Sequence, residues 1–251
     1  MKRLLIRPGA IGDFIVSLPA MESLCAECTE VWCAGQNVSL AGFADAAQSI
    51  VSAGLDRVGL LPASDVLERL RGFDSIISWY GANNNDFREC VRALPFRFLP
   101  ALPDGNMHAV EFYNRQAVQE GGNPSRFPAI RCPEAPRSFA VVHPFASSLA
   151  KRTPMQVFES VAGKLAASMP VHWLCGPEER LDGAVRFDDL FELACWLRQA
   201  RIYVGNDSGI THLASAVETP VVALFMQGPG IPLPRVWAPR GPAVHVLPQL
   251  L

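Results

Sequence analysis

Residues 201–225 hold the densest group of side chains that can bind an anionic ligand. They read RIYVGNDSGITHLASAVETPVVALF, the pattern of a strand, a sharp turn, a helix and a second strand. Asp207 or Ser208 can cap the helix, which we expect over residues 209–217. Its free N–H groups and positive dipole end suit a phosphate or diphosphate. His212 can add a donor or a positive charge. The alternative is that Asp207 and Ser208 are only caps and that His212 lies on the helix surface.

A second candidate is Asp13, which follows a glycine-bearing loop with Gly9 and Gly12 after the apolar segment RLLIR. A carboxylate at the end of a strand can point into a ligand cleft and act as a general base. The same residue can instead be the N-cap of the helix that opens there, and its spacing alone favours the cap.

A third candidate is the loop at residues 147–152. Lys151, beside Arg152, can balance a diphosphate if this loop folds towards the helix start near Ser208. Ser147 and Ser148 can donate hydrogen bonds to the same phosphates. The alternative is that the basic pair and both serines are solvated.

The elements that must position these residues alternate between apolar strands and helical patterns, which is typical of parallel α/β layers. We expect strands at 3–7, 29–33, 57–61, 75–79, 139–143, 171–175 and 221–225, and helices from residue 13 and at 38–47, 66–70, 107–120, 154–167 and 188–200. The polar stretch 81–86 is either a surface loop or part of a ligand-facing edge. Residues 121–136, with two glycines and four prolines, form the best linker candidate. We therefore predict two doubly wound domains, 1–136 and 137–251, with a ligand cleft between them.

Composition limits the classes of function. The formal net charge of −2 and a pI near 6.2 provide no basic field for nucleic acid. No apolar run approaches a membrane span, and the charged start does not match a signal peptide, so we expect a cytoplasmic chain. The seven cysteines are spread along the chain, which indicates reduced thiols. Cys25 and Cys28 have no second C-x-x-C or paired histidines nearby, so a zinc or redox site is not favoured.

Three separated segments carry the most specific pattern: LLIRPGAIGDFIVSLPAMESL, HPFASSLAKRTP and VGNDSGITHLASAVETPVVALF. Together and in this order they resemble glycosyltransferase family nine, the ADP-heptose:lipopolysaccharide heptosyltransferases and their relatives. The resemblance implies an α/β, GT-B architecture of two Rossmann-like domains. The first would bind the acceptor, and the second, here compact or truncated, would bind the sugar nucleotide.

The resemblance also implies roles for the candidates. It assigns Asp13 the base role, which reverses the preference for a cap, and places Gly9 and Gly12 near the cleft. The implied donor site contains Ser147, Ser148, Lys151, Asp207, Ser208, Gly209 and His212. Either Glu178 or Glu179 would lie near the ribose, although an exposed acidic turn is an equal alternative. No metal or other cofactor is implied, because positive side chains and a helix terminus can replace magnesium and no D-x-D pair is present.

Our main hypothesis is therefore an inverting, metal-independent glycosyltransferase. It would move a heptose or related sugar from a nucleotide diphosphate, with ADP-heptose favoured, to a lipopolysaccharide-core, other glycan or lipid-linked acceptor. This hypothesis is compatible with peripheral contact with a membrane surface. The alternative is a catalytically silent protein that binds sugar nucleotides. A dinucleotide oxidoreductase is disfavoured because Gly9-Ala-Ile-Gly12 lacks the G-x-G-x-x-G spacing.

Overall fold

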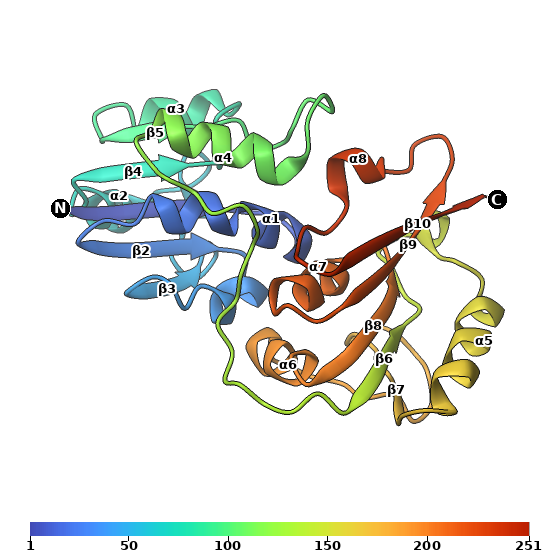
Figure 1. The fold of residues 1–251 in the computed structure, drawn as a ribbon. Helices are drawn as coiled ribbons and strands as arrows, with labels where there is room; N and C mark the ends of the chain where they lie inside the picture. The colour runs from blue at the N-terminus through green and yellow to red at the C-terminus, as the bar shows by residue number, and fades with distance from the viewer. Residues whose placement is uncertain (251) are drawn as a thin grey trace.

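The computed structural model describes residues 1–250 and contains two five-stranded sheets (Figure 1). The strand orders are β3-β2-β1-β4-β5 and β10-β9-β8-β6-β7. All neighbouring strands pair in parallel. The predicted α/β class with two parallel layers is therefore confirmed.

The first sheet is covered by helices on both faces, and successive side chains of its strands point to opposite faces. Its strands are β1 (Lys2–Arg7), β2 (Cys28–Cys33), β3 (Ala46–Ser49), β4 (Ser75–Ser78) and β5 (Phe96–Phe98), and its helices are α1 (Ile11–Ser23), α2 (Ser64–Leu70), α3 (Asn85–Cys90) and α4 (Ala109–Gln119). In β1, Leu4 and Ile6 join one buried cluster, which includes α2 residues, while Leu5 joins the cluster of α1 and α4. This alternation follows from the two-residue period of a strand.

The second sheet is covered on both faces too. Its strands are β6 (Phe139–His143), β7 (Val171–Trp173), β8 (Ala200–Asn206), β9 (Val221–Gln227) and β10 (Val244–Leu250), and its helices are α5 (Met155–Ala166), α6 (Leu190–Leu197), α7 (Gly209–Ala216) and α8 (Pro234–Trp237). Val142 and Val204 pack with Phe158 of α5 on one face. Tyr203, next to Val204, packs on the other face with α6 and α7.

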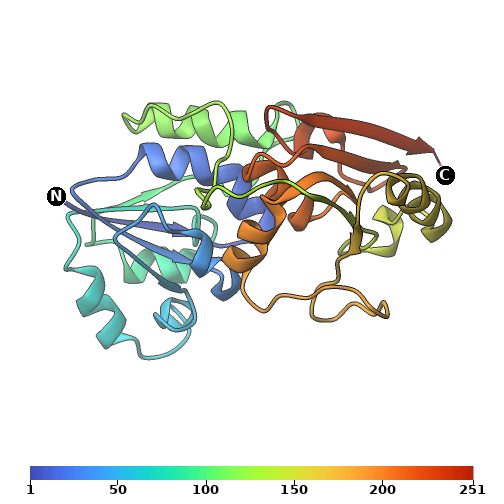
Figure 2. The ribbon, with the colours of Figure 1, turned by 60° about the horizontal axis from the view of Figure 1, so that its bottom comes forward.

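The two sheets meet through helices, because α1 packs against both α4 and α7. One buried cluster runs through this contact and includes Phe14 and Leu18 of α1 with Leu213 of α7. Residues 121–136 contain neither helix nor strand and cross between the two halves (Figure 2). The domain division at 136/137 stays a prediction, although the linker segment has the irregular structure that its prolines and glycines favour.

Two glycines allow the first turns of α1 and α7 to touch. A Cβ atom at Gly209 would lie 2.7 Å from the Ile11 Cβ and 3.1 Å from the Gly12 nitrogen. A Cβ at Gly12 would lie 3.3 Å from the His212 ring. The backbone therefore approaches at Gly209 more closely than any larger residue allows.

We expect Gly209→Ala to destabilise the protein, although alanine normally stabilises a helix by up to about 1 kcal/mol relative to glycine. The new methyl group must push α1 away from α7, so a lower melting temperature should result. Gly163→Ala in α5 is the matched control, because a Cβ there has no neighbour within 4 Å. The interpretation fails if both substitutions raise the melting temperature equally.

The structure corrects two expected elements of the first half. The segment 38–47 is not a helix, because it contains the end of a 3₁₀ helix (Gly35–Leu40) and the start of β3. The expected strand at 57–61 is wrong as well, because a short 3₁₀ helix (Leu55–Arg57) and turns occupy this region. Gly54 and Gly59 have φ angles of +73° and +86°, which bend the chain there.

Other boundaries differ by small amounts. Helix α1 begins at Ile11, two residues before the position expected from Asp13. Helix α3 and the short strand β5 were not expected. No helix in residues 1–250 has both the length and the apolar character needed to cross a membrane. All seven cysteines are free.

Candidate active site

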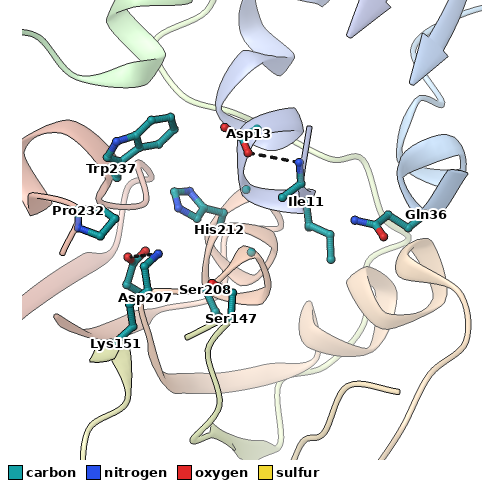
Figure 3. A pocket seen from close by; sticks show the side chains of 13 residues that line it. Ile11, Asp13, Gln36, Ser147, Lys151, Asp207, Ser208, His212, Pro232 and Trp237 are labelled. Carbon is teal, nitrogen blue, oxygen red and sulfur yellow. Dashed lines mark hydrogen bonds and ion pairs between the residues drawn. The ribbon is translucent and has the colours of Figure 1, made fainter. Parts of the chain in front are cut away.

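A pocket of about 380 Å³ lies where segments from both halves converge (Figure 3). It is lined by Ala10, Ile11, Gly12, Asp13, Gln36, Ser147, Lys151, Asp207, Ser208, Gly209, His212, Pro232 and Trp237. Each lining segment follows the carboxyl end of a strand: β1, β2, β6, β8 or β9. Ligands of parallel α/β sheets usually bind at this edge.

Asp13 is the third residue of α1 and not its N-cap, which is Ala10. Its Oδ2 atom accepts a hydrogen bond from the Ala10 amide at 3.3 Å, so the carboxylate also supports the helix start. Gly9 has a φ angle of +117°, and a Cβ there would lie 2.9 Å from the Asp13 Cβ. Gly9 therefore makes room for Asp13 without itself lining the pocket.

Arg7 fixes the first turns of α1 from below. It is 2% exposed, and its guanidinium donates to the Asp13 carbonyl at 2.9 Å, to the Ser17 hydroxyl at 3.0 Å and to the Tyr113 hydroxyl at 2.8 Å. These hydrogen bonds are needed because a guanidinium charge that is removed from water is costly unless its N–H groups have partners. The backbone that carries Asp13 is consequently tied to both β1 and α4.

Lys151 and Asp207 form an ion pair on the opposite side of the pocket from Asp13 (Figure 3). The Lys151 Nζ lies 2.7 Å from the Asp207 Oδ2, and the two side chains are 19% and 7% exposed. Burial raises the pKa of Asp207, and Lys151 opposes that rise through a hydrogen bond and its charge. Lys151 is therefore not a solvated cation.

The loop with Lys151 is held in place by Asn206, the last residue of β8. Asn206 is fully buried; its Nδ2 donates to the Pro144 carbonyl at 2.7 Å, and its Oδ1 accepts from the Thr153 amide at 3.0 Å. These two bonds span both ends of the loop. The asparagine of the VGND segment thus orients the lysine next to the start of α7.

The sequence offered Asp207 or Ser208 as the N-cap of α7, and the structure has Ser208. Its side chain accepts a hydrogen bond from the Thr211 amide at 3.4 Å. Asp207 is not the cap. Gly209 begins the helix and lines the pocket. The first N–H groups of a helix have no partner within it, so this end of α7 can receive an anion.

His212 lies in the wall of the pocket but is buried, so it is not a solvated residue of the helix surface. Burial lowers its pKa to about 3, with smaller effects from His108 and Lys151. The ring is therefore neutral near pH 7. Of the two contributions expected of His212, a donor or a positive charge, the neutral ring favours the hydrogen-bond donor.

The protein should lose stability as the pH falls below about 6.5, because two buried histidines resist protonation. Burial also lowers the pKa of His108, to about 4. Its Nε2 bonds the Ala238 carbonyl at 2.8 Å, and its Nδ1 accepts from the Val110 amide at 3.2 Å, an arrangement that requires a neutral ring. Unfolded histidines take up protons near pH 6.5. The unfolded state is thus favoured progressively down to about pH 4 through His108 and to about pH 3 through His212, and no such effect is expected at higher pH.

Urea unfolding at several values between about pH 7.5 and about pH 5 measures this loss. The slope of the unfolding free energy against pH counts the protons that are taken up on unfolding. His108→Gln should lower this slope by about one proton. His245→Gln, at an exposed position, is the control and should leave the slope unchanged. Equal slopes in all three proteins would contradict the prediction.

A second cavity of about 740 Å³ adjoins the pocket, since Gln36 and Ser147 line both. Glu179 and Arg152 lie in this second cavity. The Glu179 Oε2 accepts from the Gly176 amide at 2.6 Å and lies 3.2 Å from the His143 Nε2. Burial raises the pKa of Glu179, but these hydrogen bonds outweigh it and the pKa is lowered, so the group is a carboxylate.

Most of the expected site residues therefore line one pocket. Glu179 lies in the adjoining cavity, while Ser148 is exposed and lines neither. Sequence reasoning missed Gln36, Pro232 and Trp237, whose segments reach the pocket only through the long-range fold. Asn206 was also missed, although its place beside Asp207 was a usable signal. Within residues 1–250, no three His, Cys, Asp or Glu residues gather as a metal site would require.

Solved structures with the same fold include bacterial sugar transferases. Heptosyltransferase II of E. coli, an ADP-heptose LPS heptosyltransferase, is 16% identical with a TM-score of 0.73, over 98% of this chain and 90% of that one. E. coli heptosyltransferase WaaC, with ADP, is 17% identical with a TM-score of 0.73, over 99% and 93%. A glycosyl transferase family 9 protein of Veillonella parvula is 15% identical with a TM-score of 0.76, over 99% and 86%. The expected GT-B architecture is thereby confirmed.

Comparison with curated proteins gives no match. Residues 107–234, just over half of the chain, match the profile of glycosyltransferase family 9 (heptosyltransferase). This segment includes Lys151, Asp207 and the whole of α7. The chain belongs to glycosyltransferase family 9.

Proposed function

We propose that this protein is an inverting, metal-independent glycosyltransferase that moves a heptose or related sugar from a nucleotide diphosphate to a glycan or lipid-linked acceptor. One observation carries the proposal: the Asp13 carboxylate faces the Lys151–Asp207 pair and the start of α7 within one pocket. A base and an anion site on opposite walls are what sugar transfer from a diphosphate requires.

The donor diphosphate would bind against Lys151 and the first N–H groups of α7, where Ser208 can add a hydroxyl donor. The nucleoside would extend into the cavity that shares Gln36 and Ser147, where the Glu179 carboxylate can accept from ribose hydroxyls. Both cavities lie in the size range of small-molecule sites.

The reaction follows from this placement. Asp13 would accept the proton of the acceptor hydroxyl as its oxygen bonds to the anomeric carbon of the sugar. The bond from that carbon to the diphosphate breaks on the other face, and the electron pair leaves with the nucleoside diphosphate. Lys151 and the dipole of α7 would stabilise the negative charge of this leaving group.

An adenine nucleotide is the favoured donor because relatives of the same fold bind one. E. coli WaaC is described with ADP and with ADP-2-deoxy-2-fluoro heptose. A lipopolysaccharide-core acceptor and a cytoplasmic location, with contact at the membrane surface, belong to the same proposal.

Purified protein tests the proposal in two steps. Thermal shift with ADP-, UDP- and GDP-sugars identifies the nucleotide, and we expect ADP-sugars to raise the melting temperature most. Sugar transfer to candidate glycan acceptors is then measured by mass spectrometry. Binding of a donor without transfer to any acceptor would instead support a catalytically silent sugar-nucleotide-binding protein.

A further inference from the structure

A chain of buried polar side chains runs from the second cavity to the start of α7. It begins at Glu179, whose Oε2 lies 3.2 Å from the His143 Nε2. The His143 Nδ1 lies 3.2 Å from the Tyr203 hydroxyl, which lies 3.1 Å from the Thr211 hydroxyl. The Thr211 hydroxyl lies 3.1 Å from that of Ser208. Every consecutive pair is thus within hydrogen-bond distance.

The three middle residues are inaccessible to a ligand. His143 is 2% exposed, and Tyr203 and Thr211 are fully buried. Only the two ends of the chain, Glu179 and Ser208, line cavities. Among the described residues no hydrogen bond joins Glu179 to Ser208 directly, whereas the three middle residues give a hydrogen-bonded route between them.

The position of the Tyr203 hydroxyl depends on Gly205. Both residues lie on β8, two apart, so they share a face of the strand. A Cβ at Gly205 would lie 2.5 Å from the Tyr203 hydroxyl oxygen and 2.7 Å from a ring carbon. A side chain at this position would displace the phenol from its place between His143 and Thr211.

The carboxylate sets the direction of the bonds. Glu179 can only accept, so the His143 Nε2–H donates to it. The one proton of the Tyr203 hydroxyl lies between two acceptors, the His143 Nδ1 and the Thr211 hydroxyl oxygen, and links them. The Thr211 hydroxyl donates to the Asn206 carbonyl, which leaves the two lone pairs of its oxygen free to accept from Tyr203 and from Ser208. Burial raises the pKa of Tyr203, which keeps its hydroxyl protonated as a donor.

We propose that His143, Tyr203 and Thr211 are positioning residues that couple the carboxylate of Glu179 to the hydroxyl of Ser208. Occupation of the nucleoside cavity would thereby help to orient the diphosphate site. The coupling rests on the proposed function, because that function places a ribose at Glu179 and a phosphate at Ser208. Hydrogen bonds in a buried, low-dielectric chain polarise one another, so a change at one end alters the strength of the others.

A double-mutant cycle with Glu179→Gln and Ser208→Ala tests the coupling. ADP affinity is measured by calorimetry for the unmodified protein, both single variants and the double variant. We expect the two effects to be non-additive by about fivefold. In a Tyr203→Phe background, which lacks only the linking hydroxyl, the effects should be additive within about twofold.

Thr219→Val is the matched background. Thr219 is also buried, and its hydroxyl donates to the Leu197 carbonyl at 2.6 Å, outside the chain described here. The non-additivity should therefore persist in Thr219→Val. Thr211→Val breaks the chain at its other end and serves if Tyr203→Phe does not fold. Non-additivity that survives in both broken backgrounds, or that is absent from the unmodified background, overturns the proposal.

The same cycle is measured without ligand, from the equilibrium constant of unfolding in urea. The effects of Glu179→Gln and Ser208→Ala on this constant should be non-additive when Tyr203 is present and additive in the Tyr203→Phe background. This arm separates the two proposals, because failure of ADP to bind the unmodified protein would refute the donor assignment only. Additive effects on unfolding in the Tyr203 background would refute the positioning role even if ADP binds.

Discussion

Asp13→Asn is expected to lower turnover by roughly 10²–10⁴-fold, the usual contribution of a positioned general base. Asparagine keeps the size of the side chain and can still accept from the Ala10 amide, but it cannot take the proton of an acceptor hydroxyl. Donor affinity should stay within about twofold, because Lys151 and the start of α7 lie on the other wall of the pocket. The loss should therefore fall on the chemical step.

The measurement combines the single-turnover rate, donor affinity by calorimetry and the melting temperature. Glu192→Gln is the matched control, because Glu192 is also an acidic residue in the first turn of a helix, α6, and is exposed outside the pocket. Both variants should lose less than about 1 kcal/mol of stability through the helix start. A near-normal rate in folded, donor-binding Asp13→Asn would leave Asp13 with a structural role only.

The sequence was most informative where the site is local. Ser208, Gly209 and Asp207 fall within three consecutive residues after a strand, so turn chemistry and strand polarity predict their common location. Lys151 required one more step, because its loop follows a neighbouring strand, β6, in the same sheet. The parallel pairing of β6 and β8 then brings both segments to one edge.

Long-range packing accounts for what the sequence did not reveal. Trp237 and Pro232 reach the pocket because the chain folds back after β9, and no local pattern encodes that return. Strand β3, with the sequence AAQS, has no apolar alternation, so its pairing with β2 decides its structure. The Val-Gly-Leu-Leu run at 58–61 resembles a strand, but its one glycine, Gly59, has a φ angle of +86° and lies in a turn.

Burial explains why His212 is a neutral side chain. Its spacing within α7 allowed a surface position, yet α7 packs against α1, so the ring is covered by the first turn of the other half. A histidine buried in this way stays neutral, and Lys151 is left as the cation nearest the start of α7 among the residues that line the pocket. The positive charge that would face a bound diphosphate in this pocket therefore depends on one side chain, Lys151.

For that reason Lys151→Ala should weaken donor binding by roughly 10–100-fold, the range for loss of a charge-assisted contact. The substitution also leaves Asp207 buried without its partner, so its carboxylate would repel the phosphates. Lys151 normally opposes the rise in the pKa of Asp207, and without it that pKa should rise further. Donor affinity of Lys151→Ala should consequently improve as the pH falls and Asp207 becomes protonated, an improvement that the unmodified protein should not show.

The double variant Lys151→Ala/Asp207→Asn separates the two effects. It removes the buried charge, so it should regain most of the stability lost in Lys151→Ala, while donor affinity stays low because the cation is still missing. Lys164→Ala, at an exposed position of α5, is the control for loss of a lysine and should bind the donor normally. Calorimetry with ADP-sugars across the pH range provides the affinities, and urea unfolding provides the stabilities. Lys151 is the one lysine or arginine among the residues that line this pocket. Unchanged donor binding in Lys151→Ala would therefore show that the diphosphate binds elsewhere.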